Sequence, residues 1–193
     1  MRVISGKYRG HPLKTIKGDA TRPTTDRVKE SMMSAIQSRL GGFEGICVLD
    51  AFAGSGALGI EALSRGAELV WFCERSRNAI SVIQGNLSAL KVERVRYKVR
   101  AGDVNTLPAT AGAPVFGLVF FDPPYAYDCA EVLQLADRLY ESGMLTEDSI
   151  VCYEHAKKDT PVLEETLDTL QWQTVSAKDY GQTTLHLLRK ELS

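Results

Sequence analysis

The stretch VLDAFAGSGALG, residues 48–59, decides the expected fold. An apolar run ends in Asp50, a glycine-rich turn follows, and apolar residues then recur at helical spacing. This order is typical of a buried parallel strand that leads through a tight turn into a helix. Gly54, Gly56 and Gly59 fit G-x-G-x-x-G, in which the first glycines let the backbone approach a ligand and the third lets the helix pack closely on the strand. The pattern alone leaves open whether the turn is a ligand loop or a purely structural one.

The composition is that of one soluble globular domain. The chain has 193 residues, of which 44% are hydrophobic and 24% are charged, enough for a substantial single core. Apolar runs such as 115–121 are far shorter than the ~20 residues that a membrane helix needs. The first residues lack the apolar region of a signal peptide. We therefore expect a cytoplasmic protein with no membrane partner.

Cysteine and histidine usage argues against a metal site or a disulfide framework. Four cysteines occur without a C-x-x-C pair, and the three histidines are scattered. Cys47, Cys73 and Cys152 lie in apolar runs that predict strands, where a free thiol behaves as a small hydrophobic side chain. We expect no bound metal.

The net charge of −1 hides an asymmetry between the N-terminus and the rest. Residues 1–29 hold eight Lys or Arg and two Asp, so they carry +6 and the remainder carries −7. A basic arm on an acidic body predicts a polyanionic partner that the arm contacts. A merely solvated tail is the alternative interpretation.

Turn signals at Gly6, 10–12 and 18–19 predict an irregular or hairpin arm over residues 1–20. A helix start follows at 21–26, with Pro, Thr and an acid in the expected positions. Apolar residues then recur every fourth position from 28 to 40, and the glycine pair 41–42 ends the helix.

From residue 45 onward, strands and helices alternate. Strands are predicted at 46–52, 69–74, 95–101, 118–122, 150–155, 173–178 and 183–189, and helices at 57–64, 78–90, 129–140 and 162–170. The first five strands are joined by helix-length crossovers, which predicts a parallel sheet with helices on both faces. The short connection 179–182 predicts an antiparallel hairpin of the last two strands at one edge.

Acidic residues end the predicted strands, where this fold binds its ligands. Asp50, Glu74, Asp103 and Asp122 occupy these ends. Their charges would repel a pyrophosphate, but they suit a ligand with a cationic amine, a ribose and an adenine amino group, as in S-adenosylmethionine. The glycines and Glu74 would serve a nicotinamide dinucleotide equally well. Asp103 and the motif that begins at Asp122 favour S-adenosylmethionine.

The motif Asp122-Pro123-Pro124-Tyr125 predicts the chemistry. Two prolines make the turn stiff and leave carbonyl oxygens without competing N–H groups. Asp122 and the Pro123 carbonyl can accept hydrogen bonds from an exocyclic amino group and so direct its lone pair toward a methyl donor. The stiff turn supplies orientation, and the Tyr125 ring would stack on an extruded base. The alternative is a turn that only ends the strand.

Residues 43–193 resemble the class I S-adenosylmethionine-dependent methyltransferases. The resemblance implies a seven-stranded sheet of order 3-2-1-4-5-7-6 with strand 7 antiparallel. It implies that Glu74 binds the ribose hydroxyls, that Asp103 and the Val104 backbone read the adenine, and that Arg75 occupies a position that often packs on adenine. The implied cofactor site comprises Asp50, Phe52, Ala53, Gly54, Ser55, Gly56, Glu74, Arg75, Asp103 and Val104. The 122–125 motif resembles the signature of methyltransferases that act on planar amino nitrogens, which fixes the reaction type but not the substrate.

Segments 2–10, 21–30 and 50–67 are similar to the bacterial RsmD family, and the similarity runs essentially the full length. Its members methylate guanine N2 in 16S ribosomal RNA. The resemblance implies a small-subunit rRNA partner, assembled or assembling. We expect a monomer in which a basic N-terminal arm and helix (1–42) form part of the same domain as the methyltransferase fold (43–193). We expect RNA contacts from Arg2, Lys7, Arg9, Arg22, Arg27 and Lys29.

Alternatives remain at this stage. The basic run 94–100 is interpreted as protection of an edge strand rather than as a phosphate contact. An adenine-N6 methyltransferase acting on DNA or RNA shares the motif chemistry. A nicotinamide-dependent oxidoreductase and a non-catalytic RNA-binding protein on the same scaffold are the other hypotheses.

Overall fold

The computed structural model describes residues 1–16, 26–124 and 127–191. Its centre is a seven-stranded sheet in the order β3-β2-β1-β4-β5-β7-β6. The first five strands pair in parallel, and β7 runs antiparallel to both β5 and β6. The predicted order and the predicted antiparallel hairpin are both confirmed. Among the described residues, no helix is long and apolar enough to cross a membrane.

The element bounds follow the sequence pattern closely. The strands are β1 (Cys47–Asp50), β2 (Leu69–Glu74), β3 (Tyr97–Ala101), β4 (Leu118–Phe121), β5 (Ile150–Ala156), β6 (Trp172–Tyr180) and β7 (Thr183–Lys190). The helices are α1 (Asp26–Leu40), α2 (Ala57–Ser64), α3 (Arg77–Ala89), α4 (Cys129–Glu141) and α5 (Thr160–Leu170). The predicted start of the first helix at 21–25 lies outside the described residues.

The third strand is shorter than predicted. Residues Arg94–Arg96 form a 3₁₀ turn, and the strand begins only at Tyr97. The Arg96 guanidinium caps the end of α2 by donating to the Leu63 and Ala67 carbonyls, at 3.3 and 2.7 Å. Arg96, which belongs to the alternating pattern of basic and apolar residues, therefore serves to cap α2 instead of forming part of the strand.

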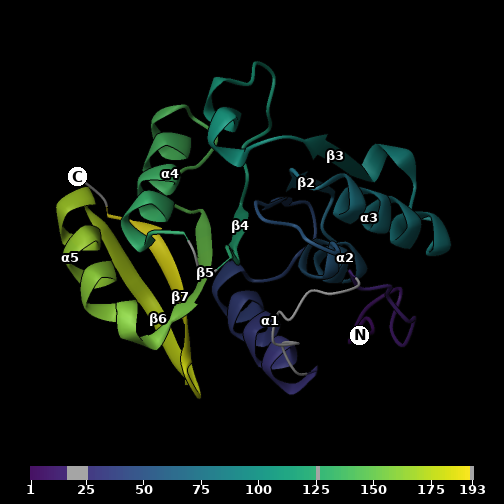
Figure 1. Ribbon diagram of the computed structural model, residues 1–193, viewed down its shortest axis with the longest axis horizontal. Helices are drawn as coiled ribbons and strands as arrows, with labels where there is room; N and C mark the ends of the chain where they lie inside the picture. The colour runs from purple at the N-terminus through teal and green to yellow at the C-terminus, as the bar shows by residue number, and fades with distance from the viewer. Residues whose placement is uncertain (17–25, 125–126, 192–193) are drawn as a thin grey trace.

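Helices cover both faces of the sheet (Figure 1). Side chains of α1, α2 and α3 pack with one set of strand residues, and those of α4 and α5 pack with the other. Neighbouring residues of one strand face opposite cores, as Phe120 and Phe121 do, because side chains alternate along a strand. The carboxyl ends of β1, β2 and β4 therefore open between two packed layers.

The N-terminal arm is docked on the domain rather than extended. Val3, Tyr8 and Leu13 are buried in the same core as α1 and α2. Arg2 and Pro12 form an antiparallel bridge, which gives the arm the hairpin shape expected from its turn signals.

Two polar side chains of α2 hold the arm in place. The Glu61 carboxylate accepts from the backbone N–H groups of Ile4 and Ser5, at 2.8 and 3.0 Å. Ser64 accepts from the Tyr8 N–H and donates to the Ser5 carbonyl. Glu61 is fully buried, and these donors satisfy the polar groups that burial would otherwise leave unpaired.

Candidate active site

The glycine loop between β1 and α2 forms the floor of the site. Gly54 and Gly56 have φ of 51° and 80°, in the left-handed region that favours glycine. A Cβ on Gly59 would lie 2.3 Å from the Phe72 ring. The third glycine of the motif is therefore required for close packing of helix on strand, as predicted.

Asp50, at the end of β1, is buried and accepts from the Gly59 N–H at 2.9 Å. This contact places a carboxylate at the N-terminus of α2, where the helix dipole favours negative charge. Burial, together with the charges of the nearby acids Asp122 and Glu74, nevertheless raises the Asp50 pKa to about 7. A cationic group of a ligand would relieve this concentration of negative charge.

Glu74, at the end of β2, is oriented by three backbone N–H groups. Its Oε2 accepts from Gly54 at 2.9 Å, and its Oε1 accepts from Arg75 and Ser76 at 2.9 and 2.8 Å. Since a carboxylate offers about four acceptor positions, Oε2 retains one for a ligand hydroxyl. The carboxylate also ties the glycine loop to β2.

Asp103 follows β3 and begins the 3₁₀ turn Val104–Ala109. Its Oδ1 accepts from the Asn105 backbone and side chain, at 2.9 and 3.0 Å. Asp103 is exposed at the rim of the cleft, whereas Val104 is buried behind it. This arrangement fixes the Asp103 carboxylate while leaving its other oxygen open.

Asp122 follows β4 directly and stands beside Glu154 of β5. The two strands pair in parallel up to Phe121 and Tyr153, so the next residues on each strand are neighbours. Asp122 is open to the cleft, yet the surrounding protein removes part of the water around its carboxyl group. This desolvation raises the Asp122 pKa to about 6. Burial and the Asp122 charge raise the Glu154 pKa to about 7. Two carboxyl groups thus face one end of the cleft.

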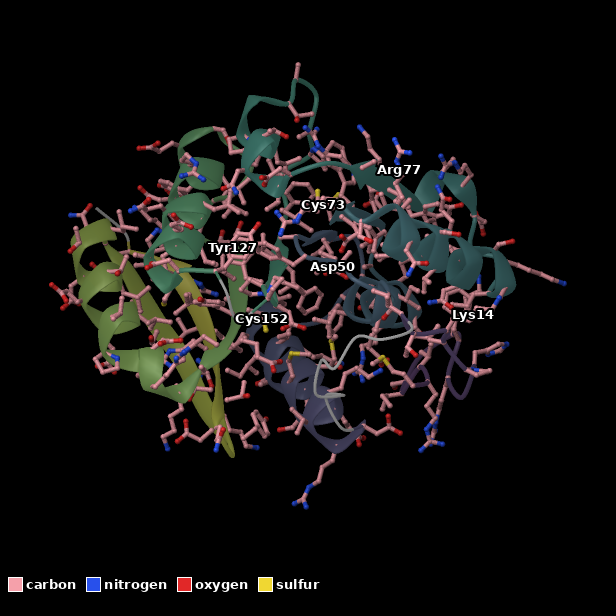
Figure 2. All side chains as sticks on the ribbon, viewed as in Figure 1. Lys14, Asp50, Cys73, Arg77, Tyr127 and Cys152 are labelled. Carbon is pink, nitrogen blue, oxygen red and sulfur yellow. The ribbon has the colours of Figure 1, made fainter. Side chains whose placement is uncertain are left out.

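An aromatic wall adjoins the Asp122 turn. The Phe52 and Tyr127 rings meet edge to face with centroids 5.1 Å apart. The Arg75 guanidinium lies 5.8 Å from the Tyr127 centroid, within the range of a cation–π contact. Figure 2 shows Asp50 and Tyr127 near the middle of the molecule, and both line the same cleft. Tyr125, predicted to stack on a base, lies outside the described residues.

These groups share one cleft of about 720 Å³, a size typical of sites for cofactor-sized ligands. All ten predicted cofactor residues except Gly56 line it, and so do Asp122, Pro123 and Pro124. Gly56 is buried in the same loop. The carboxyl groups at the strand ends suit a ligand with an amine and a ribose, so the residues present fit S-adenosylmethionine.

The predicted RNA contacts divide into exposed and buried side chains. Arg2, Lys7, Arg9 and Arg27 are exposed, and Arg2 pairs with Asp26 at 2.9 Å. Arg22 lies outside the described residues.

The prediction for Lys29 is wrong. Its side chain is only 2% exposed, because it donates to the Arg2 carbonyl at 2.8 Å and lies 3.9 Å from Glu61. Burial lowers its pKa. Lys29 therefore holds the arm against α2 from inside the domain and does not belong to the exposed basic surface of the arm.

Comparisons with known proteins assign the chain to a family. Residues 1–189 match the family described as "Conserved hypothetical protein 95". The chain belongs to this family. "Ribosomal RNA small subunit methyltransferase D" of Haemophilus influenzae is 34% identical over 84% of this chain and 82% of its own length. "Putative rRNA methyltransferase YlbH" of Bacillus subtilis is 38% identical over 98% of this chain and 99% of its own length.

A solved structure supports the same assignment. The protein yhhF from Escherichia coli superposes with a TM-score of 0.79 at 29% identity, covering 100% of this chain and 99% of its own. The fold is therefore that of a class I methyltransferase, and the family is one of RsmD-like methyltransferases. The resemblance drawn from the motifs is confirmed at this level.

Two side chains of the site escape prediction from the sequence. Glu154 lies in an otherwise apolar strand, and the sequence does not show which strand pairs with it. Its position near the carboxyl end of that strand was the one feature that could have indicated a site residue. Tyr127 follows the 122–125 motif by two residues, and only the fold brings its ring against Phe52.

Proposed function

We propose that this methyltransferase transfers a methyl group to the exocyclic N2 of a guanine in 16S ribosomal RNA, within the assembled or assembling small subunit. The observation that carries the proposal is the Asp122 carboxyl, held by a rigid Pro-Pro turn at the open end of the cofactor cleft. Relatives that share most of the chain are named small-subunit rRNA methyltransferases, which supports the choice of substrate.

The cofactor is expected to bind across the ends of β1, β2 and β3. Asp50 and the glycine loop would hold its amino-acid portion, Glu74 its ribose, and Asp103 with Val104 its adenine. S-adenosylmethionine, when bound, supplies a methyl group on a positively charged sulfur. The acids at these strand ends would balance the positive charges of the bound ligand. Without the ligand, those positive charges are missing from the site.

Asp122 and the Pro123 carbonyl orient the amino nitrogen. They accept hydrogen bonds from the two N2–H groups, so that the nitrogen lone pair points at the methyl carbon. The cofactor held by Asp50, Glu74 and Asp103 would supply its methyl group to this nitrogen and would keep the electron pair of the broken bond to sulfur. The proton that N2 then loses passes to Asp122 or to water. Such orientation is worth several kcal/mol of barrier.

The exposed basic residues of the arm are proposed to contact the rRNA backbone. Arg2, Lys7 and Arg9 lie on the docked hairpin, and Arg27 lies on α1. Because the arm is fixed to α2 by buried hydrogen bonds, its charges have a defined position relative to the cleft. We assign residues 1–42 to RNA contact and 43–193 to catalysis.

The test is methyl transfer from labelled S-adenosylmethionine to small subunits that lack the modification, to naked rRNA and to duplex DNA. Nucleoside mass spectrometry then identifies the product. N2-methylguanosine from the subunits is the expected result. N6-methyladenine, or label only in DNA, would overturn the substrate while keeping the chemistry, and absence of transfer to all three would overturn the proposal as a whole.

A further inference from the structure

We propose that Glu154 is a specificity-determining residue that accepts the N1–H hydrogen bond of the target guanine, beside the N2 amino group held by Asp122. The inference rests on the proposed function, because it names the feature of the base that the same site reads. Glu154 would be the group that admits guanine and rejects the other amino-bearing bases.

The register of the sheet places Glu154 at the substrate end of the cleft. Phe121 of β4 pairs with Tyr153 of β5, and paired residues of parallel strands point to the same face. Asp122 and Glu154 are the next residues on these strands, and both line the cleft. The cofactor acids Asp50, Glu74 and Asp103 follow β1, β2 and β3, on the other side of β4.

The pair Asp122 and Glu154 matches two adjacent donors on a ligand. The charge of Asp122 acts on Glu154 and raises its pKa, so the two carboxyl groups are close enough to repel each other. Neighbouring hydrogen-bond donors would relieve this repulsion.

Among the bases with an exocyclic amine, guanine offers such a pair. Its N1–H and N2–H₂ groups are adjacent donors on the Watson–Crick edge. Adenine and cytosine have a ring nitrogen with a lone pair next to the amine, which a carboxylate would repel. A site built to accept a hydrogen bond discriminates strongly against a ligand that lacks the donor, because its own polar group is then left unpaired.

The test replaces the N1–H donor in the substrate and the acceptor in the protein. After the methylated guanine has been located by mass spectrometry, small subunits are reconstituted from ligated rRNA that carries either guanine or 2-aminopurine at that nucleotide. The 2-aminopurine base keeps the N2 amine but has an N1 lone pair. Rates are measured at pH 8, above the Glu154 pKa of about 7, so that the carboxylate is ionised.

We compare the wild type with Glu154→Gln and with Glu131→Gln, a matched change on the exposed side of α4. The wild type and Glu131→Gln should prefer guanine over 2-aminopurine roughly a hundredfold, as expected for one hydrogen bond to a charged group. In Glu154→Gln the amide N–H can donate to the N1 lone pair of 2-aminopurine. Its guanine rate should fall while the preference shrinks at least about tenfold.

Equal rates of the wild type on the two bases would overturn the inference, whatever the behaviour of the variant. An equal loss on both bases in Glu154→Gln would also overturn it, since a structural role lowers both rates together. Either result leaves the proposed function standing if the wild type still yields N2-methylguanosine. Absence of that product would instead overturn the proposed function.

Discussion

Asp50 combines full burial, a single hydrogen bond from Gly59 and two negative neighbours. Its pKa of about 7 in the folded protein exceeds the value near 4 of an unfolded chain. The folded state therefore binds more protons between these values, and this contribution to stability is lost as the pH rises from about 4 through 7. Burial of Asp50 thus lowers the free energy of unfolding most under basic conditions.

We predict that Asp50→Asn raises the melting temperature of the cofactor-free protein at pH 8 and raises it less at pH 5. The difference in unfolding free energy at pH 8 should be about 2–4 kcal/mol, since each pKa unit corresponds to about 1.4 kcal/mol. Denaturant unfolding of both proteins across this pH range measures it. A difference that does not vary with pH would contradict the assigned pKa.

Asp122→Ala should lower kcat by about 10- to 150-fold and leave the affinity for S-adenosylmethionine nearly unchanged. The variant loses an acceptor that orients the amine but no group assigned to the cofactor, and a hydrogen bond to a charged group is worth about 1.5–3 kcal/mol. Steady-state kinetics and calorimetric cofactor binding measure the two effects. A parallel loss of cofactor affinity would show that Asp122 has a different role.

At the residue scale, the sequence identifies side chains whose positions follow from strand ends. Asp50 and Glu74 are such residues, because each ends an apolar run that predicts a strand. Lys29 and Glu61 are the opposite case. Both look like the solvated charges of an amphipathic helix, and only the docking of the arm buries them together. Nothing local in the sequence distinguishes a charge that a distant segment will cover.

At the scale of elements, the docking of the arm on α2 depends on close backbone approach. Gly6 has a φ of 81°, and a Cβ there would lie 1.8 Å from the Ser64 carbonyl oxygen. Gly10 has nearly the same φ, 83°, but a Cβ there would have no neighbour within 4 Å. Substitution at either glycine would strain the backbone, but only substitution at Gly6 would also cause a clash with α2. Comparing the two therefore separates the cost of backbone strain from the cost of the clash.

We predict that Gly6→Ala destabilises the protein more than Gly10→Ala by about 1–3 kcal/mol. Both changes cost backbone strain, but only the first forces the hairpin away from α2. Denaturant unfolding of the two variants gives the difference. Equal losses would mean that the arm tolerates displacement and is not held by this contact.

The alternation of strands and helices was predictable from the sequence. The spacing of the apolar residues indicates the type of each element, and glycine or proline residues mark where elements end. The sheet order was not predictable, since the order 3-2-1-4-5-7-6 depends on which crossover goes to which side and was implied only by the family resemblance. The start of β3 was also missed. Arg94–Arg96 fit a strand pattern, but Arg96 finds carbonyl acceptors at the end of α2 and the chain turns first.

At the scale of the whole molecule, two groups of exposed basic side chains can be compared as sites of RNA contact. Lys7 and Arg9 lie on the arm, and Arg94 and Lys98 lie at the β3 edge of the sheet, with their charges over the rings of Tyr97 and Trp71. The arm lies against α2, whose first turn lines the cleft. The edge cluster is better explained as protection against strand pairing.

Neutralising Lys7 and Arg9 together should weaken rRNA binding and lower the slope of log affinity against log salt by about 1–2. Neutralising Arg94 and Lys98 is the matched control and should leave the slope unchanged. Binding of small subunits or rRNA over a salt series measures both. A slope that falls only in the control pair would place the RNA contact at the β3 edge of the sheet instead of on the arm.

The buried Asn86 of α3 has a further consequence. Its side chain accepts from the Lys14 N–H and donates to the carbonyls of Lys14 and Ser55, at 2.9, 3.1 and 3.0 Å. One amide therefore joins the end of the arm to the glycine loop. A partner that favours the docked arm must also favour the present geometry of the loop, so RNA and cofactor affinities are expected to be thermodynamically linked. By reciprocity, the factor by which rRNA tightens cofactor binding equals the factor by which the cofactor tightens rRNA binding.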